Sequence, residues 1–342
     1  MKAVVYQGVD KPLTLMERAM PVAGPGELVL RVEACGICGS DIHAAQTEFV
    51  PVGTVMGHEF CGEVTEVGPD VEGWQPGDRA VGVPLWYCGE CDHCKRNDQF
   101  SCPNMKYIGL QDDVDGAFAD YVRIPVSNAL KFDARISSEH AALWEPLSVA
   151  FKAFKRGQVQ PDDSVLIVGG GAIGLSIALI AKSLGVQHVG LSEMQPERLE
   201  RASRCGANVV IDAKEEEDPV AAFTRQTGKV PRVIFECVGL PGMYQRLIDI
   251  APKGAHLVIV GVCMVPEEFS VISASFKQLT CSFSIAYEQA EIDYILESLA
   301  LGAINPEPLI SKRTGFDEFC DTFEYLKTPN AECKVLFSPE PV

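Results

Sequence analysis

Four cysteines close together in the first half of the chain constrain its folding more than any other feature. They are Cys88, Cys91, Cys94 and Cys102, with the spacing C-x2-C-x2-C-x7-C. Four thiolates this near in sequence can surround one tetrahedral Zn²⁺ and leave no open position, which is the arrangement of a structural zinc site. The lobe around them, at about residues 86–104, is rich in charged and turn residues. Metal binding would therefore supply the folding free energy that apolar burial does not supply there.

Other interpretations of these cysteines stay open at this point. They could form two disulfides or be four unrelated thiols, although sequence-local pairs seldom serve as structural disulfides in an intracellular protein. Pro103 directly follows the last cysteine, as a proline often does in iron–sulfur motifs. The rest of the chain argues against a cluster and favours zinc.

Composition limits the classes of partner and location. A chain of 342 residues predicts two domains. The sequence has no apolar run that could cross a bilayer, and its first residues, MKAVVYQGVDKPLTL, lack the pattern of a signal peptide. We therefore expect a cytoplasmic protein, in which 13 cysteines indicate metal binding and buried thiols rather than disulfides. The net charge of −18 argues against nucleic acid or an anionic membrane as a partner.

The spacing of the apolar runs changes near residue 150. Residues 1–148 contain short runs of Val, Ile and Leu separated by Gly, Pro and Asp, which is typical of a barrel-like β domain. In residues 149–287, six strand-like runs alternate with helical patterns and predict a doubly wound parallel sheet. We expect residues 288–342 to pack back onto the first domain, which gives an α/β chain of two domains with a ligand site in the cleft between them.

A glycine-rich turn follows the first of these strand-like runs. VLIVGG has the pattern of a strand buried on both faces, and Gly169, Gly171 and Gly174 fit G-x-G-x-x-G at the start of a helix. In that setting Gly169 permits a tight turn, Gly171 lets the backbone approach a pyrophosphate, and Gly174 allows the helix to pack closely on the sheet. The first helical N–H groups, which include those of Ala172 and Ile173, would face the phosphates. This context predicts a dinucleotide-binding domain.

An acidic residue ends the next strand-like run. Glu193 lies 19 residues past Gly174, where a carboxylate binds the adenosine ribose hydroxyls and repels a 2′-phosphate. The next basic residue is Arg198, which would line the adenine end. NAD is therefore expected rather than NADP, although a helix-capping role for Glu193 is the simpler alternative.

A second group of metal-binding residue types lies in the β-rich half. One thiol, one imidazole and one or two carboxylates make a zinc site that keeps a position open for water or substrate. Such an ion lowers the pKa of a bound alcohol, whose carbon can then deliver hydride to a nicotinamide. The segments that carry these residues are CGICGSDIH, with Cys38, Ser40, Asp41 and His43, GHEF, with His58 and Glu59, and WEP, with Glu145.

Together these motifs resemble the zinc-dependent medium-chain dehydrogenase/reductase family over essentially the whole chain. The resemblance includes GHEFCGEVTEVGPDVEGWQPGDRAVG, the four-cysteine lobe, GGGAIG, and the strand ends ECVG and VIVGV. It implies a GroES-like β-barrel catalytic domain, a Rossmann NAD-binding domain, one catalytic and one structural Zn²⁺, and a homodimer or homotetramer. The context EPLSVAFKA is similar to the polyol branch, which includes sorbitol, threonine and butanediol dehydrogenases.

The same resemblance implies roles for single residues. Cys38 and His58 match two ligands of the catalytic zinc, and either Glu59 or Glu145 could complete the set. Ser40 matches the hydroxyl that takes the alcohol proton, and His43 matches the imidazole that passes this proton to solvent. Asp41 is expected to orient these groups. The positions that match nicotinamide contacts are Val238, Val260, Val262, Ser284 and Ile285, and Lys334 is expected to reach the pyrophosphate.

One departure from the family pattern bears on the substrate. Sorbitol-type enzymes carry an Arg and several polar residues after the last strand of the coenzyme domain, whereas this chain has FSIAYEQ. The segments expected to line the substrate pocket, at residues 48–56, 86–87 and 110–118, are also rather apolar. We therefore expect a secondary alcohol or vicinal diol to be oxidised to the ketone with NAD. The alternatives are a threonine- or sugar-alcohol-type dehydrogenase and a non-catalytic NAD-binding protein.

Overall fold

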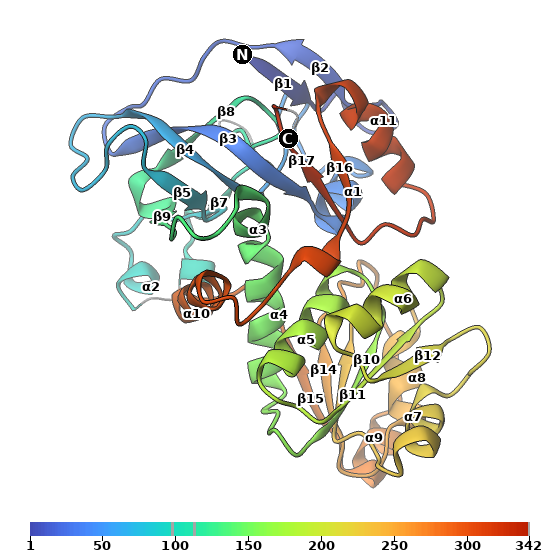
Figure 1. The fold of residues 1–342 in the computed structure, drawn as a ribbon. Helices are drawn as coiled ribbons and strands as arrows, with labels where there is room; N and C mark the ends of the chain where they lie inside the picture. Colours follow the sequence, from blue (N-terminus) through green and yellow to red (C-terminus); the bar gives the residue numbers. More distant parts are fainter. Residues whose placement is uncertain (97–98, 112–113, 341–342) are drawn as a thin grey trace. The chain divides into compact units, whose positions relative to one another are not determined.

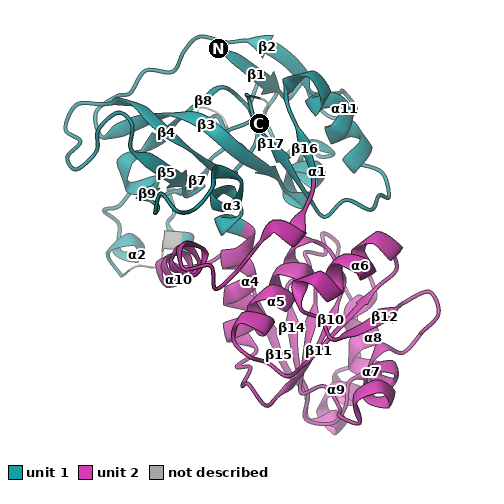
Figure 2. Ribbon diagram, viewed as in Figure 1, with its two compact units in different colours: residues 1–145, 312–342 teal, residues 146–311 magenta. Residues whose placement is uncertain are grey.

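The computed structural model describes residues 1–96, 99–111 and 114–340, and these residues form two compact units (Figure 2). The first unit comprises residues 1–145 and 312–342, and the second comprises residues 146–311. Residues 97–98 of the predicted cysteine lobe and residues 112–113 of the predicted pocket segment lie outside the described part of the chain. In the described part, no helix combines the length and the apolarity that crossing a membrane requires.

The first unit is built on an antiparallel sheet of seven strands (Figure 1). Six of them follow the order β16-β17-β3-β4-β5-β9, and β8 also pairs with β3. β3 is long and almost wholly buried, because both of its faces are covered. The sheet strands are β3 (Glu27–Ile37), β4 (Glu59–Val67), β5 (Arg79–Gly82), β8 (Tyr121–Pro125), β9 (Ala129–Lys131), β16 (Ile310–Thr314) and β17 (Lys334–Phe337).

Smaller elements surround this sheet. A two-stranded ribbon of β1 and β2 carries the N-terminus, and a second ribbon of β6 and β7 forms the base of the cysteine lobe. Their bounds are β1 (Lys2–Val5), β2 (Thr14–Glu17), β6 (Leu85–Trp86), β7 (Lys106–Tyr107), α1 (Gly39–Ala45), α2 (Asp92–Lys95), η1 (Gln99–Ser101), η2 (Val126–Asn128), α3 (Ser138–Ala142) and α11 (Phe316–Leu326).

Aromatic side chains from the C-terminal segment complete the core of the first unit. Phe319 of α11 lies 4.7 Å from Phe118 and 5.1 Å from Phe337, measured between ring centroids. Buried aromatic pairs of this kind add to the stabilisation that burial alone gives. Residues 312–340 therefore belong to the same compact unit as residues 1–145.

The second unit is a six-stranded sheet in the order β12-β11-β10-β13-β14-β15, with every neighbouring pair parallel. Figure 1 shows helices on both faces of this sheet, as a doubly wound fold requires. The strands are β10 (Ser164–Val168), β11 (His188–Glu193), β12 (Val209–Asp212), β13 (Val233–Glu236), β14 (His256–Ile259) and β15 (Thr280–Phe283). The helices are α4 (Trp144–Arg156), α5 (Ala172–Ser183), α6 (Pro196–Cys205), α7 (Pro219–Thr227), α8 (Met243–Ile250), α9 (Val271–Lys277), α10 (Gln289–Ala300) and η3 (Glu307–Leu309).

The chain passes between the units twice, and the second passage differs from the predicted boundary. Residues 288–311, expected with the catalytic domain, belong to the second unit instead. The reason lies in the contacts of α10 with α4, where Phe151 stacks on Tyr294 with 4.1 Å between ring centroids. Lys152 also forms an ion pair with Glu288, and Lys155 forms one with Glu291. At the first passage, the units meet at residues 145–146 rather than 148–149.

Candidate active site

Cys38, His58 and Glu59 come together in the first unit. Their ligand atoms all lie within 4.8 Å of one another. Cys38 follows the end of β3 and His58 precedes the start of β4, and antiparallel pairing sets Gly36 opposite Glu59. A Cβ at Gly36 would lie 2.0 Å from Glu59 Oε2, so only a glycine there leaves room for the carboxylate. Thiolate, imidazole and carboxylate make a donor set that suits Zn²⁺ with a position left open.

Asp41 holds both of the first two ligands. Its Oδ1 lies 3.0 Å from His58 Nδ1, and its Oδ2 accepts a hydrogen bond of 3.0 Å from the backbone N–H of Cys38. An Nδ1–H bond to a carboxylate fixes the tautomer in which Nε2 carries the lone pair for a metal. Burial lowers the pKa of His58, but the charge of Asp41 outweighs it and raises this pKa well above its ordinary value, so metal binding at Nε2 would displace a proton.

Lys334 lies against this group. Its Nζ donates to both carboxylate oxygens of Glu59 at 2.7 Å and to the carbonyl of Ile37 at 3.2 Å. Burial alone would lower the pKa of Lys334, but the Glu59 carboxylate raises it above the ordinary value. That Lys334 binds the pyrophosphate stays a prediction, and its buried ammonium is paired with Glu59.

The other three catalytic candidates are Ser40, His43 and Glu145, and one of them contacts a ligand of this group. Ser40 Oγ lies 3.4 Å from His58 Nε2, on the side of the ring that faces away from Asp41. His43 is exposed on α1, as a residue that exchanges protons with solvent must be. Glu145 is buried in the first turn of α4, and its carboxylate is not one of the three groups that meet within 4.8 Å.

Tyr107 is a residue of this site that the sequence interpretation missed. Its ring meets the imidazole of His58 edge-on, with 5.5 Å between centroids and an angle of 76° between the planes. Burial raises the pKa of the phenol, so the hydroxyl stays neutral and can donate a hydrogen bond. Neither motif nor spacing distinguishes Tyr107 from an ordinary core residue, because pairing of β6 with β7 brings it to the site.

The four cysteines of the lobe also come together, with a geometry that fits one ion. The sulfur–sulfur distances are 3.5 Å for Cys91–Cys94, 3.6 Å for Cys88–Cys102 and 4.0 Å for Cys88–Cys94. Tetrahedral Zn–S bonds of about 2.3 Å imply sulfurs about 3.8 Å apart, whereas a disulfide requires about 2.05 Å. Hydrogen bonds from the backbone N–H groups of Glu90 and Cys91 lower the pKa of Cys88 to about 6, which favours the thiolate. The described residues contain no disulfide.

In the second unit, the glycine-rich turn has the expected geometry. Gly169 follows β10 with φ of +104°, a conformation that side chains disfavour. A Cβ at Gly174 would lie 1.9 Å from the carbonyl oxygen of Gly169, so glycine is required for the helix to start here. A Cβ at Gly171 would meet no atom within 4 Å, which leaves open space in front of the N-terminus of α5. Ala172 and Ile173 open that helix, where an anion finds unpaired N–H groups.

Glu193 ends β11 beside this turn. Its Oε2 accepts a hydrogen bond of 2.9 Å from the backbone N–H of Gly170, and its Oε1 accepts bonds from Met194 and Gln195. Arg198 Nη1 lies 3.8 Å from the same carboxylate. Glu193 and Arg198, the predicted adenosine-binding pair, therefore lie close together in space.

The predicted nicotinamide contacts follow the ends of neighbouring strands. The carboxyl ends of parallel strands share one edge of the sheet, so these residues lie along the edge from which Gly169 projects. Ser284 is buried, and its Oγ has no hydrogen-bond partner in the described part of the chain. The residues after β13, β14 and β15 are Val238, Val260 and Val262, and Ser284 and Ile285.

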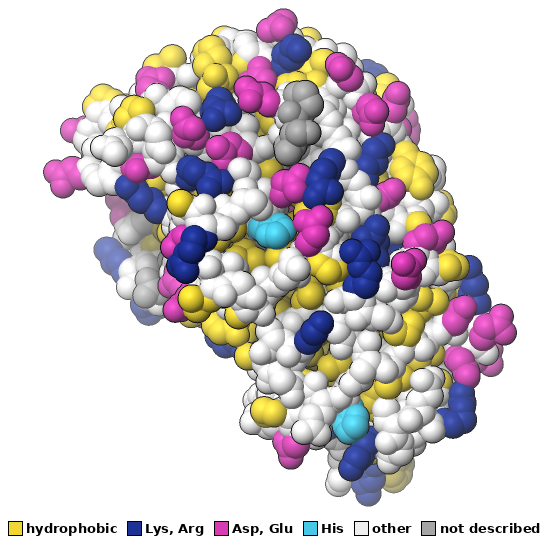
Figure 3. Space-filling model, in the orientation of Figure 1, with side chains coloured by type: hydrophobic (Ala, Val, Ile, Leu, Met, Phe, Trp, Pro, Cys, Tyr) yellow, Lys and Arg dark blue, Asp and Glu magenta, His cyan; other side chains and the backbone are white. Residues whose placement is uncertain are grey.

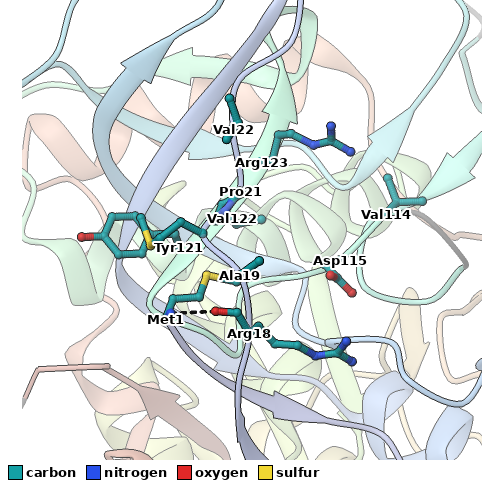
Figure 4. A pocket seen from close by; sticks show the side chains of 11 residues that line it. Met1, Arg18, Ala19, Pro21, Val22, Val114, Asp115, Tyr121, Val122 and Arg123 are labelled. Atoms are coloured by element: carbon teal, nitrogen blue, oxygen red, sulfur yellow. Dashed lines mark hydrogen bonds between the residues drawn. The ribbon is translucent and has the colours of Figure 1, made fainter.

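Charged side chains and a cavity are further features of the molecule. Acidic and basic side chains are interspersed over the face drawn in Figure 3. A cavity of about 320 Å³ lies in the first unit, near the N-terminus (Figure 4). Arg18, Asp115 and Tyr121 are among its lining residues, and it includes none of the predicted catalytic or metal-binding residues. Two of these side chains are engaged, since Arg18 donates to the carbonyl of Gly53 and Asp115 accepts from the N–H of Val55.

Comparison with known proteins identifies the family to which this chain is similar. Residues 24–134 match the alcohol dehydrogenase GroES-like domain, and residues 172–300 match the zinc-binding dehydrogenase family. The chain is 31% identical to an L-threonine 3-dehydrogenase of Rhizobium johnstonii, over 97% of this chain and 96% of the relative. It is 35% identical to an L-threonine 3-dehydrogenase of Thermococcus kodakarensis, over 95% and 94% of the two chains.

Solved structures share the fold along the whole chain. A dehydrogenase of Escherichia coli in complex with NADH is 28% identical with a TM-score of 0.88, and 99% of each chain is covered. A protein of Sinorhizobium meliloti, described as a zinc-binding dehydrogenase and bound to NADP, is 31% identical with a TM-score of 0.89 and the same coverage. The 2R,3R-butanediol dehydrogenase of Bacillus subtilis is 28% identical with a TM-score of 0.88, again over 99% of each chain. The chain therefore belongs to the zinc-binding medium-chain dehydrogenases, in the alcohol and polyol branch whose members act on a CH–OH group with NAD(P).

Proposed function

We propose that this protein is a zinc-dependent dehydrogenase that uses NAD to interconvert a secondary alcohol or vicinal diol and the corresponding ketone. The observation that carries the proposal is the meeting of Cys38, His58 and Glu59, with ligand atoms within 4.8 Å. The coenzyme turn at Gly169–Gly174, in the same chain, supports it.

Each residue of the first unit has a distinct part in this reaction. Cys38, His58 and Glu59 would hold the catalytic zinc, and Glu145 is a further buried carboxylate of the same unit. When bound, the zinc ion supplies a Lewis acid for the substrate oxygen, and the dinucleotide supplies the hydride acceptor. Ser40 Oγ, 3.4 Å from His58 Nε2, is placed to accept the proton of the alcohol. His43 is exposed and passes that proton to solvent.

The proposed preference for NAD rests on Glu193. Its carboxylate lies beside the turn that would bind the pyrophosphate, where it can accept hydrogen bonds from both ribose hydroxyls. A 2′-phosphate at the same position would meet a negative charge. Because related structures contain either NADH or NADP, the choice depends on residues such as this one rather than on the fold.

The proposed substrate class follows from the residues expected around the site. The stretch FSIAYEQ lacks the Arg of sorbitol-type enzymes, which argues against a long sugar alcohol. A relative that oxidises a butanediol favours a small diol, whereas relatives that oxidise L-threonine make an amino alcohol the second candidate. Initial rates can distinguish these candidates directly.

We also propose that the protein is a homo-oligomer, with a dimer as its basic unit. β15 is an edge strand, and exposed apolar side chains gather in the segment that contains α9 and β15. A monomer seldom leaves both an open sheet edge and a large apolar surface in water. We refer to the exposed side chains of this segment as the edge patch: Met264, Val265, Phe269, Val271, Ile272, Phe276 and Phe283.

The test of the proposed reaction is a set of initial rates of NAD⁺ reduction with simple secondary alcohols, vicinal diols, sugar alcohols and L-threonine, with NADP⁺ in parallel. We expect the highest kcat/KM for a secondary alcohol or diol, and its loss in Cys38→Ser. A preference for sugar alcohols or threonine would contradict the substrate class but not the reaction. Full activity of Cys38→Ser would contradict the zinc chemistry, and no activity of the zinc-loaded protein on any substrate would favour a non-catalytic NAD-binding protein.

A further inference from the structure

Tyr107, on β7, contacts the candidate metal-binding group of Cys38, His58 and Glu59 but belongs to none of the motifs that carry these ligands. Its ring contacts the imidazole of His58 edge-on, with 5.5 Å between centroids. His58 in turn meets Cys38 and Glu59, with ligand atoms within 4.8 Å of one another. The hydroxyl therefore lies among the groups that would surround a substrate, and all of them belong to the first unit.

The backbone fixes Tyr107 on both sides. β7 pairs with β6, with Tyr107 opposite Leu85, and the next residue donates a hydrogen bond of 2.9 Å to the carbonyl of Pro84. The N–H of Tyr107 donates to Gln111 Oε1 at 2.9 Å, and its carbonyl accepts from the N–H of Leu110 at 3.1 Å. The position of the ring is therefore set before any substrate binds, which is what a selective contact requires.

The hydroxyl of Tyr107 has no hydrogen-bond partner among residues 1–96, 99–111 and 114–340. The residue is half-buried, so its ring is packed while its polar end can still be reached by a small ligand. A hydroxyl that is partly removed from water and left unpaired costs stability, unless a ligand supplies the partner.

We propose that Tyr107 is a specificity-determining residue whose hydroxyl donates a hydrogen bond to the second oxygen of a vicinal diol or hydroxyketone. This inference rests on the proposed function, because that reaction places the first oxygen at Cys38, His58 and Glu59. The second oxygen is on the adjacent carbon, and so lies beside the metal ligands rather than on them. Tyr107 touches His58 from the side, and a neutral donor suits a site that already contains the carboxylates of Asp41 and Glu145.

A single hydroxyl can decide between substrates here. The other segments expected near the substrate are rather apolar. A site that pairs a substrate hydroxyl discriminates against an analogue without it, because its own polar group is then left unpaired. A mono-alcohol of the same carbon skeleton would therefore bind less well in the transition state than the diol.

The experiment compares kcat/KM for butane-2,3-diol and butan-2-ol in the zinc-loaded protein and in Tyr107→Phe. The phenylalanine keeps the ring against His58 and removes only the hydroxyl. We expect the wild type to prefer the diol, and Tyr107→Phe to lower the diol-to-mono-alcohol ratio by about ten-fold, the effect of one hydrogen bond. Zinc content should stay unchanged, the thermal midpoint should not fall, and the loss of kcat/KM should be larger for the diol than for butan-2-ol. Tyr121→Phe, in the cavity of Figure 4, is the matched control and should leave the ratio unchanged.

Three results would overturn the inference. The first is an unchanged ratio in Tyr107→Phe, and the second is an equal loss on both substrates, which would indicate a structural role. The third needs no variant: a wild-type enzyme that oxidises butan-2-ol as well as the diol has no contact to the second oxygen. In all three cases the proposed reaction still stands, whereas a zinc-loaded protein that oxidises neither these substrates nor any other alcohol overturns both proposals.

Discussion

Asp41 connects two of the candidate zinc ligands through one carboxylate. One oxygen bonds His58 Nδ1 and the other accepts from the backbone N–H of Cys38, and the side chain is fully buried. The carboxylate therefore sets both the tautomer of the imidazole and the start of the helix that follows the thiol. A residue of this kind acts on the metal through its ligands rather than by touching it.

We predict that Asp41→Asn weakens the catalytic zinc site without removing it. The amide can still bond the N–H of Cys38, but it no longer stabilises His58 with a negative charge. Loss of such a partner typically lowers metal affinity about 10- to 100-fold. Competition with a chromophoric chelator should show one of two zinc ions lost at lower chelator concentration. Asp133→Asn, at an exposed acid paired with Arg135, serves as the control and should change nothing. Equal retention of both ions in Asp41→Asn would contradict the role.

Glu193→Ala tests the cofactor preference. Removing the carboxylate removes charge-assisted hydrogen bonds to the ribose, each worth about 1.5–3 kcal/mol, so NAD⁺ should bind roughly ten-fold or more weakly. The positive charge of Arg198, which lies 3.8 Å from the carboxylate, would then attract a 2′-phosphate, and NADP⁺ should bind more tightly. Dissociation constants from NADH and NADPH fluorescence report both effects. Glu197→Ala, four residues along, should leave both constants as they are, and the same outcome for Glu193→Ala would rule out its role.

The residue scale also shows what sequence can and cannot predict. Cys38, His58 and Gly169 belong to local motifs whose function can be predicted from residue spacing alone. Lys334 and Tyr107 belong to no such motif. Lys334 reaches Glu59 because β17 pairs with β3, with Val335 opposite Ile37, and such pairings join positions that are far apart in the chain. A contact made by tertiary pairing leaves no local signal.

Among the elements, the cysteine lobe is the one whose folding depends most on metal binding rather than on apolar burial. Its α2 is a single turn whose N-cap is Cys91, and the Cys91 sulfur accepts from the N–H of Cys94 at 3.5 Å. The ribbon of β6 and β7 emerges from this lobe and carries Tyr107 to the catalytic group. Metal binding in the lobe therefore fixes a residue of the active site as well as a surface loop.

We predict that Cys94→Ser removes one zinc ion and lowers stability. An ion held by four thiolates loses a ligand, and each kcal/mol lost lowers the midpoint by about 2–4 °C in a domain of this size. We expect a fall of at least about 5 °C in the thermal midpoint, one zinc per chain by atomic absorption instead of two, and a reduced preference for diols through Tyr107. Cys263→Ser, at a half-buried thiol outside the lobe, is the control. Two zinc ions and an unchanged midpoint in Cys94→Ser would exclude a four-thiolate site.

At the scale of elements, the sequence predicts boundaries best where the hydrophobic periodicity ends at a glycine or proline. α5 ends at Ser183, and Gly185 lies just past it with φ of +77°, the conformation in which glycine commonly terminates a helix. The segment after residue 288 was harder, since α10 has an ordinary amphipathic pattern that does not say which unit it covers. Its stacking and ion-pair partners on α4 decide that, and they become visible only in three dimensions.

On the scale of the whole molecule, β15 is an edge strand of the second unit whose outer backbone groups could pair with another strand. β15 forms hydrogen bonds with β14 on one side only, and the N–H groups of Thr280 and Ser284 point toward that neighbour. Those of Cys281 and Phe283 therefore point outward, because N–H direction alternates along a strand. Two identical edges can pair about a two-fold axis and continue the sheet, and the edge patch would be buried in the same contact.

We predict that the protein sediments at twice the chain mass of 37.1 kDa, or at a multiple of that dimer. Phe276, the most exposed residue of the edge patch at 78%, lies on α9 just before β15. A glutamate there would bury a charge in the interface, so Phe276→Glu should shift the equilibrium to monomer by analytical ultracentrifugation. Val230→Glu places the same charge at another exposed apolar side chain of the second unit and should remain a dimer. A wild type that stays monomeric at micromolar concentration would show that the open edge of β15 is tolerated in water, and Phe276→Glu as a dimer would move the contact to another surface.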